Sequence, residues 1–172
     1  MGFNMDKRWI LILIIFLVGV AALYFVVDTS NTVGKAVVAV NTYTITVPET
    51  YNIENSETYL ATVINRATGE KITVEDVGKG NDVDDMYELE LTDIQSAANV
   101  TTINHTTEKY KNTTLKTIYY EKSDKINKIS VFTKFGHTFT ITSEKYKDID
   151  TLNEKTHFIL DSLKQDYKKS QD

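Results

Sequence analysis

The sequence has no cysteine, one proline and seven glycines among its 172 residues. The lack of cysteine excludes disulfide bonds, thiolate metal sites, thiol nucleophiles and lipid attachment at cysteine. It does not indicate the cellular compartment, because a chain without cysteine is compatible with an oxidising or a reducing environment. Since proline and glycine are scarce, we expect most of the chain to form regular secondary structure rather than linkers.

Catalytic signatures are also missing. The sequence contains no Gly-x-Ser-x-Gly nucleophile motif, no glycine-rich phosphate loop and no dinucleotide-binding fingerprint. Its three histidines, His105, His137 and His157, share no spacing typical of metal ligands, and we interpret them as surface or edge residues. The sequence therefore predicts no catalytic residue, no metal site and no cofactor.

The acidic run between residues 82 and 93 is the segment with the best supply of calcium ligands. It lacks the glycine that an EF-hand loop needs at its sixth position. We interpret the run as the start of a helix, where carboxylates interact favourably with the helix dipole.

A hydrophobic run extends from Trp9 to Val27 and contains no charged residue. A helix of these 19 residues would be about 28 Å long, close to the hydrocarbon thickness of a bilayer. Lys7 and Arg8 precede the run and Asp28 follows it, so the positive-inside rule places the N-terminus in the cytoplasm. We therefore expect a single-pass protein of the cell membrane with an extracytoplasmic C-terminal domain. A cleaved signal peptide fits less well, because the run is long and no small-x-small cleavage site follows.

The predicted membrane segment divides the chain into five parts. Residues 1–8 form a short cytoplasmic N-terminus, 9–27 the transmembrane anchor and 28–36 a tether. Residues 37–167 are enough for one extracytoplasmic domain, and 168–172 form a tail. Without Asp6, Lys7 and Arg8, 17 of the 19 basic and 23 of the 24 acidic residues remain, and Arg66 is the one arginine. This balance disfavours nucleic acid as a partner, since nucleic acid usually requires a basic, arginine-rich surface.

Alternating apolar and polar residues predict β-strands in the domain. "YTITV" places Tyr43, Ile45 and Val47 on one face, and "HTFTITS" places Phe139 and Ile141 inside with threonines outside. Short turns between strands indicate an antiparallel meander with one covered and one solvent-exposed face. Further strands are predicted at residues 59–66, 71–77, 100–110, 113–122 and 126–135.

Two helices are expected to cover the apolar face of the sheet. The middle helix lies within residues 81–99 and has apolar residues at helical spacing, namely Val83, Tyr87, Leu91, Ile94 and Ala98. The C-terminal helix is predicted to begin at a capping box, Thr151 to Glu154. Its apolar face is Leu152, Ile159, Leu163 and Tyr167. The predicted order of anchor, three strands, helix, four strands and helix is an α+β fold.

The outline resembles the PsbP-like family of extracytoplasmic α+β domains. "YTITVPETYNI" is similar to the family's opening strand, with Val47-Pro48 followed by Tyr51, although Glu49-Thr50-Tyr51 stands where the family often has Gly-Trp. "FTKFGHTFTITSEKY" followed by "DIDTLNEKTHFILDSLK" is similar to its closing strands and helix. The resemblance implies an accessory or binding element of a membrane complex and supplies no catalytic motif. The composition also resembles that of small membrane-anchored surface proteins of prokaryotes, including archaea.

Three Asn-x-Thr triplets, at Asn99, Asn104 and Asn112, are candidate glycosylation sites. Chance alone predicts about two such triplets in a chain so rich in asparagine and threonine. Asn112 is the strongest candidate because it falls in a predicted turn. Asn99 suits a helix end, and Asn104 lies within a strand.

Tyr119 and Tyr120 are neighbours in a predicted strand, so their side chains should point to opposite faces. We expect one to be buried and the other exposed. Cross-strand packing explains such a pair, and an exposed tyrosine ring is also a candidate interaction surface for a protein or a glycan.

Three functions remain open at this point. The first is a non-enzymatic binding or accessory module of an envelope complex, with the bilayer and an unknown envelope protein or glycan as partners. The second is an envelope enzyme with a histidine and carboxylate site that no motif reveals. The third is a structural subunit of a surface or pilus-like assembly, although the residues before the apolar run lack the glycine and acidic residue of pilin precursors.

Overall fold

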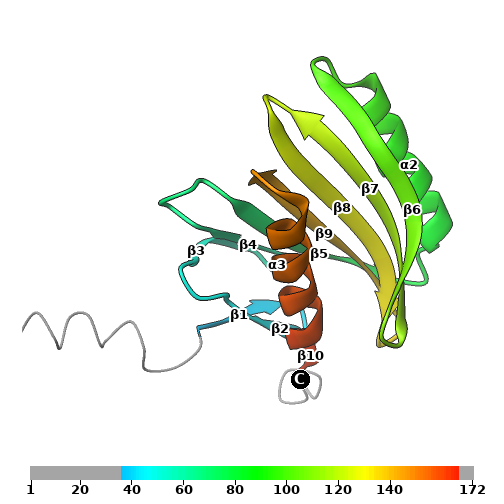
Figure 1. Cartoon of the computed structure of the whole chain (residues 1–172). Helices are drawn as coiled ribbons and strands as arrows, with labels where there is room; N and C mark the ends of the chain where they lie inside the picture. Colours follow the sequence, from blue (N-terminus) through cyan, green and yellow to red (C-terminus); the bar gives the residue numbers. More distant parts are fainter. Residues whose placement is uncertain (1–35, 167–172) are drawn as a thin grey trace, which may run out of the picture. The chain divides into compact units, whose positions relative to one another are not determined.

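A seven-stranded antiparallel sheet forms the centre of the fold in the computed structural model, which describes residues 36–166 (Figure 1). The strand order is β3-β4-β5-β9-β8-β7-β6, so β3 and β6 are its two edges. After the middle helix the chain continues at the far edge of the sheet with β6. The strands β7, β8 and β9 then follow in order back toward β5, which pairs with β9. The strands are β3 (Asn52–Ser56), β4 (Leu60–Ile64), β5 (Lys71–Lys79), β6 (Val100–Tyr110), β7 (Thr113–Lys122), β8 (Lys125–Lys134) and β9 (His137–Tyr146).

The predicted meander of β6 to β9 is confirmed, and tight turns account for it. Ser123 and Asp124 both have positive φ, at 53° and 56°, and they join β7 to β8. Phe135 and Gly136, at 54° and 76°, join β8 to β9. Two consecutive residues with positive φ are typical of the hairpin turns whose twist matches that of the strands.

A second, three-stranded sheet has the order β1-β2-β10 and was predicted only in its central strand. It consists of β1 (Val37–Val40), β2 (Tyr43–Thr46) and β10 (Lys164–Gln165). Tyr43 and Ile45 are buried, as predicted. After β2, Tyr51 is buried as well, and its hydroxyl lies 2.9 Å from that of Tyr146 on β9. Burial raises the pKa of Tyr51 to about 12.

The two predicted helices are present, and they cover opposite faces of the large sheet. Helix α3 (Ile149–Ser162) packs Leu152 and Ile159 against the core that contains Phe139 and Ile141. Helix α2 (Val83–Ser96) packs Tyr87 and Ile94 on the other face. Its partners there are Ile118, Tyr120, Ile129 and Val131.

The prediction of one solvent-exposed sheet face is therefore wrong. Thr138 and Thr140 were expected outside, but both are buried. The hydroxyl of Thr138 donates to the backbone carbonyl of Asn81, next to the start of α2 (2.6 Å). A buried threonine can thus pair its hydroxyl with a distant backbone carbonyl, so the alternation of threonine with apolar residues did not distinguish a covered face from a solvent-exposed one.

The predicted fold class included an N-terminal transmembrane helix, and this part of it must be corrected. Within residues 36–166, neither helix is long and apolar enough to cross a membrane. Both have 14 residues, fewer than the roughly 20 that span a bilayer. The predicted span from Trp9 to Val27, residues 1–8 and nearly all of the tether 28–36 lie outside the described part of the chain, as does Tyr167.

The predicted capping box of the C-terminal helix, Thr151 to Glu154, is wrong, because the N-cap lies three residues earlier. Asp148 is the N-cap, and its carboxylate accepts a hydrogen bond from the backbone N–H of Thr151 (2.7 Å). This backbone hydrogen bond lowers the pKa of the Asp148 carboxyl. Thr151 therefore lies in the first turn of the helix and donates its backbone N–H to the N-cap residue.

We expect Asp148→Ala to lower the melting temperature by several degrees, because a backbone N–H of α3 loses its partner. Thr151→Ala should lower it less, since the cap remains. Thermal unfolding followed by circular dichroism at neutral pH measures both. Equal losses from the two substitutions would contradict the assignment of Asp148 as the cap.

Candidate functional site

The three histidines lie at separate places in the fold. His105 is exposed on β6, His137 begins β9 and His157 lies in α3. His137 contacts one carboxylate, Asp76, and His157 contacts one, Glu108. The enzyme hypothesis required a histidine that meets two or more carboxylates. Between residues 36 and 166, no group of three or more such side chains is placed to hold a metal ion.

The acidic run at residues 82–93 forms the start of a helix, as interpreted from the sequence. Asp82 is the N-cap of α2, and its carboxylate accepts a hydrogen bond from the backbone N–H of Asp84 (2.6 Å). Asp84 in turn forms an ion pair with Lys116 of β7 (2.6 Å). These carboxylates thus attach the helix to the sheet.

Asp76 of β5 and His137 of β9 contact each other within the large sheet, and residues of the small sheet pack against both. The Asp76 carboxylate is fully buried and lies 2.9 Å from Nδ1 of His137. It also accepts hydrogen bonds from the side chain of Asn41 (2.7 Å) and from the backbone N–H of Gly78 (3.0 Å). The ring of Tyr43 packs edge-on against His137, with 5.2 Å between ring centroids. Asn41 and Tyr43 belong to the small sheet and its turn. The contacts of Asp76 and His137 with them give His137 a structural role in packing the two sheets together.

Tyr119 and Tyr120 point to opposite faces, but neither is the exposed interaction surface that was considered. Their exposed fractions are 7% and 8%. Tyr119 belongs to the core under α3 and Tyr120 to the core under α2. The pair is buried because helices cover both faces at this strand, so cross-strand packing is its role.

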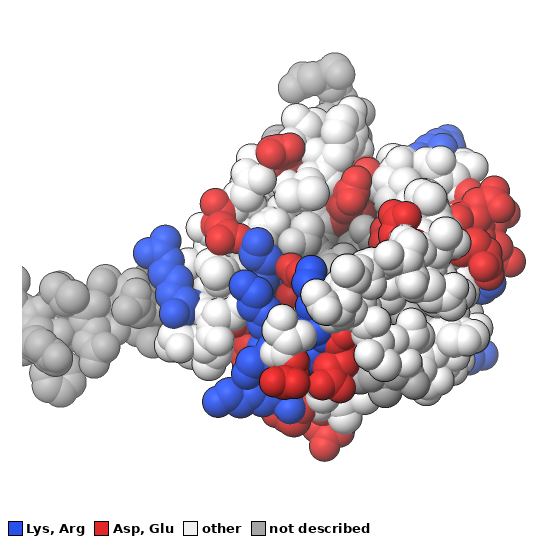
Figure 2. Space-filling view, turned by 90° about the horizontal axis from the view of Figure 1, so that it is seen from above, with Lys and Arg blue, Asp and Glu red and all other residues white. Residues whose placement is uncertain are grey.

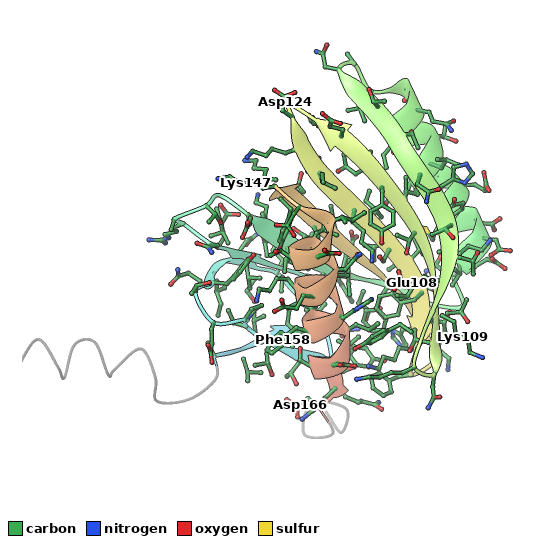
Figure 3. All side chains as sticks on the ribbon, in the orientation of Figure 1. Glu108, Lys109, Asp124, Lys147, Phe158 and Asp166 are labelled. Carbon is green, nitrogen blue, oxygen red and sulfur yellow. The ribbon has the colours of Figure 1, made fainter. Side chains whose placement is uncertain are left out.

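A groove of about 470 Å³ lies between the edge strand β6 and the N-terminal end of α3. The register of β6 on β7 pairs Asn104 with Tyr119 and Glu108 with Leu115, so these β6 residues share the sheet face that α3 covers. Figure 3 shows Glu108 on the side of β6 toward α3 and Lys109 on its other side. The lining residues are Asn104, Thr106, Thr107, Glu108, Tyr119 and Ile149.

Strand β6 is open to solvent beside this groove. The four consecutive residues 104–107 are all exposed, although alternate side chains point to opposite faces. On the adjacent strand, Ile118 and Tyr119 are both buried. The two helices therefore leave both faces of the edge strand uncovered at residues 104–107.

A buried lysine, Lys128, contacts two residues that line the groove, Glu108 and Tyr119. The Lys128 ammonium has no exposed surface and donates hydrogen bonds to Asn153 (2.9 Å) and Glu108 (3.3 Å). It also lies 5.1 Å from the centre of the Tyr119 ring. The second oxygen of Glu108 contacts Nε2 of His157 at 2.8 Å. These contacts connect the edge strand, the sheet centre and α3.

The pKa values of this cluster reflect burial of an ion pair. Burial lowers the pKa of Lys128 more than the charge of Glu108 raises it. Burial also acts to raise the pKa of Glu108, but the Lys128 charge and the hydrogen bonds from His157 and Lys128 outweigh it and lower that pKa. Tyr119 has a raised pKa, first because of burial and then because of the Glu108 charge.

We expect the stabilising contribution of Glu108 to be lost in acid. A carboxyl whose pKa is lower in the folded state contributes stability above its unfolded pKa, and this contribution is lost as pH falls through the folded pKa. The free energy of unfolding should therefore decrease below the ordinary glutamate pKa of 4.5. Urea titrations between pH 7 and 3 measure this dependence.

In that experiment, Glu108→Gln should make the decrease shallower without abolishing it, because Asp148 and Asp161 also have lowered pKa values. Glu121→Gln is the matched control, since Glu121 is exposed at the end of β7. If Glu108→Gln leaves the acid dependence as steep as in the unmodified protein, the ion pair does not carry it.

The three candidate glycosylation sites lie along β6 and its ends. Asn99 is exposed before the strand with φ of 61°, and the C-cap of α2 is Ala97 instead. Asn104 is exposed on the strand, and Asn112 is exposed in the turn after it. Exposure permits a glycan at each of the three, and its presence stays a prediction.

Sequence reasoning missed the cluster of Glu108, Lys128 and Asn153. One signal was present: Lys128 lies two residues from Ile126 and from Ser130, and four from Phe132, so it shares their core-facing side of the strand. Its partners could not be read in the same way. They come from the edge strand and from a helix, and only the strand order brings the three together.

Comparisons with known proteins identify the fold. It is similar to that of a cyanobacterial PsbP, CyanoP from Synechocystis sp. PCC 6803, with a TM-score of 0.50 and 14% identity, over 72% of this chain and 86% of that one. A Bacteroides thetaiotaomicron protein matches with a TM-score of 0.48 and 11% identity, over 72% of this chain and 45% of that one. No family model matches the sequence, and no curated protein does. The predicted PsbP-like fold is confirmed, whereas the predicted membrane-anchored surface protein is not.

Proposed function

We propose that the chain uses its PsbP-like fold as a non-enzymatic binding module, an accessory part of a larger protein complex. The partner contacts β6 and the adjacent groove. The observation that carries this proposal is the exposure of residues 104–107 on both faces of an edge strand, beside a groove of about 470 Å³. Association of the protein with the cell envelope stays a prediction from the sequence.

Charge supports a protein or glycan partner over a nucleic acid. On the face seen in Figure 2, basic side chains are interspersed with acidic ones. In the groove, the charge of Glu108 is balanced by Lys128, and the other lining residues are uncharged. Neutral, partly polar grooves suit hydrogen bonding and close packing with a protein surface.

A photo-crosslinking amino acid at position 106 tests the proposal in intact cells. We expect Thr106 replaced in this way to form an adduct of defined mass with one partner. Asn52, which is exposed on the opposite edge strand β3, is the matched control and should give no such adduct. Absence of an adduct at 106, or equal adducts at both positions, would remove β6 as the binding surface.

A further inference from the structure

We infer that the partner binds as an uncharged β-strand that extends the large sheet at β6; this inference rests on the proposed function and names the partner's chemistry. Within the described residues β6 pairs only with β7, so the backbone groups on its outer side have no strand partner. Such a row of N–H and C=O groups recognises another extended chain through main-chain hydrogen bonds.

The register of β6 suits a regular ladder. From Asn104 to Tyr110 each residue pairs with β7 without a shift, after a bulge that ends at Asn104. A strand added here meets seven residues in regular alternation, from Asn104 to Tyr110. Exposure of both faces at residues 104–107 leaves room for its side chains above and below the sheet.

The two edges of the sheet differ in their protection. Proteins usually protect exposed edges by shortness, bulges and charged side chains. Edge strand β3 has five residues and a shift between Ile53 and Asn55, and its Glu54 is paired with Lys71 (3.0 Å). By contrast, residues 100–107 of β6 contain no Asp, Glu, Lys or Arg. β6 also has a bulge, between Thr102 and Asn104, but after it residues 104–107 are uncharged and in regular register, so this part of β6 is less protected than β3.

The groove determines which side chain the added strand can bring. Because Lys128 already balances Glu108, a charged side chain entering the groove finds no free counter-ion and loses hydration. Ile149, which is 41% exposed, and the buried Tyr119 supply apolar surface, and Thr106 supplies a hydroxyl. A valine, threonine or tyrosine side chain fits this lining.

A synthetic peptide tests the inference with the purified full-length protein. The probe has a core of alternating threonine and valine and a lysine at each end for solubility. Its control has the same sequence with N-methylated backbone nitrogens, which cannot complete a strand ladder. We expect the probe to slow hydrogen exchange of outward-facing β6 amides at least tenfold, as followed by NMR, and the control to have no effect.

Two variants locate the binding. Thr106→Glu places a charge on the edge and should weaken peptide binding at least tenfold. Asn52→Glu makes the same type of change on β3 and should leave binding unchanged. Both positions are exposed, so both variants should fold, which thermal unfolding verifies.

Several outcomes would overturn the inference. These are equal binding of the N-methylated peptide, protection outside β6, or no binding of either peptide. Protection of β6 that rises with protein concentration alone, together with a doubled molecular mass, would assign the edge to a second copy of the chain instead. A crosslinked partner at position 106 without peptide binding would keep the proposed function and remove strand addition alone.

Discussion

Replacing Lys128 by alanine should destabilise the domain by about 3 kcal/mol, because it leaves Glu108 without its counter-ion. Removal of one partner from a buried ion pair costs about 3–5 kcal/mol. We expect the lower end here, since the Glu108 side chain is 26% exposed and keeps its contact with His157. Urea unfolding at neutral pH measures the change.

Two further variants separate charge from packing at this position. Lys128→Met keeps most of the aliphatic stem and should recover part of the loss. Combining Lys128→Met with Glu108→Gln removes both charges and should recover most of it, because well-packed neutral groups often replace a buried pair without loss. If the double variant is no more stable than Lys128→Ala, the ion pair is not the reason for the destabilisation.

Phe139→Ala should have an effect of similar or larger size, about 3–5 kcal/mol, because it opens a cavity at the centre of the core. Phe139 is fully buried on β9. Its ring contacts Tyr43 edge-on, with centroids 5.0 Å apart, and stacks on Phe132 at 5.7 Å. Since Tyr43 belongs to the small sheet, the substitution removes packing between both sheets.

Phe135→Ala is the matched control for this prediction. Phe135 also stacks on Tyr43, with 5.7 Å between centroids, but it is 46% exposed in the β8–β9 turn. We expect it to cost less than about 1 kcal/mol. Urea unfolding of both variants gives the comparison, and a loss at Phe135 as large as that at Phe139 would refute the central position of Phe139.

The local patterns predicted most strands and both helices, because each depends on residues close in sequence. Phe139 and Ile141 alternate as a buried strand face requires, and Tyr87 and Ile94 recur at helical spacing. The short strands β1, β3 and β10 were missed. All five residues of β3 are exposed, so no alternation marks it.

The groove could not be predicted, because its parts meet only through long-range pairing. Nothing near Glu108 in the sequence indicates Lys128 or His157 as its partner. Their contact depends on the order β8-β7-β6 and on α3 crossing that part of the sheet. Likewise, burial of Thr138 follows from where α2 lies, which the alternation of β9 does not encode.

The pairing of β5 with β9 has a consequence for how the domain is made. The first residues of β5, Lys71 and Ile72, pair with Glu144 and Ser143, more than 70 positions later in the chain. During synthesis, β5 must therefore wait, unpaired on one side, until α2 and all four strands of the meander have emerged. The meander itself needs only neighbouring turns and can form first. Closure of the sheet by β9 is then the late, slow step of folding, as expected for contacts of large sequence separation.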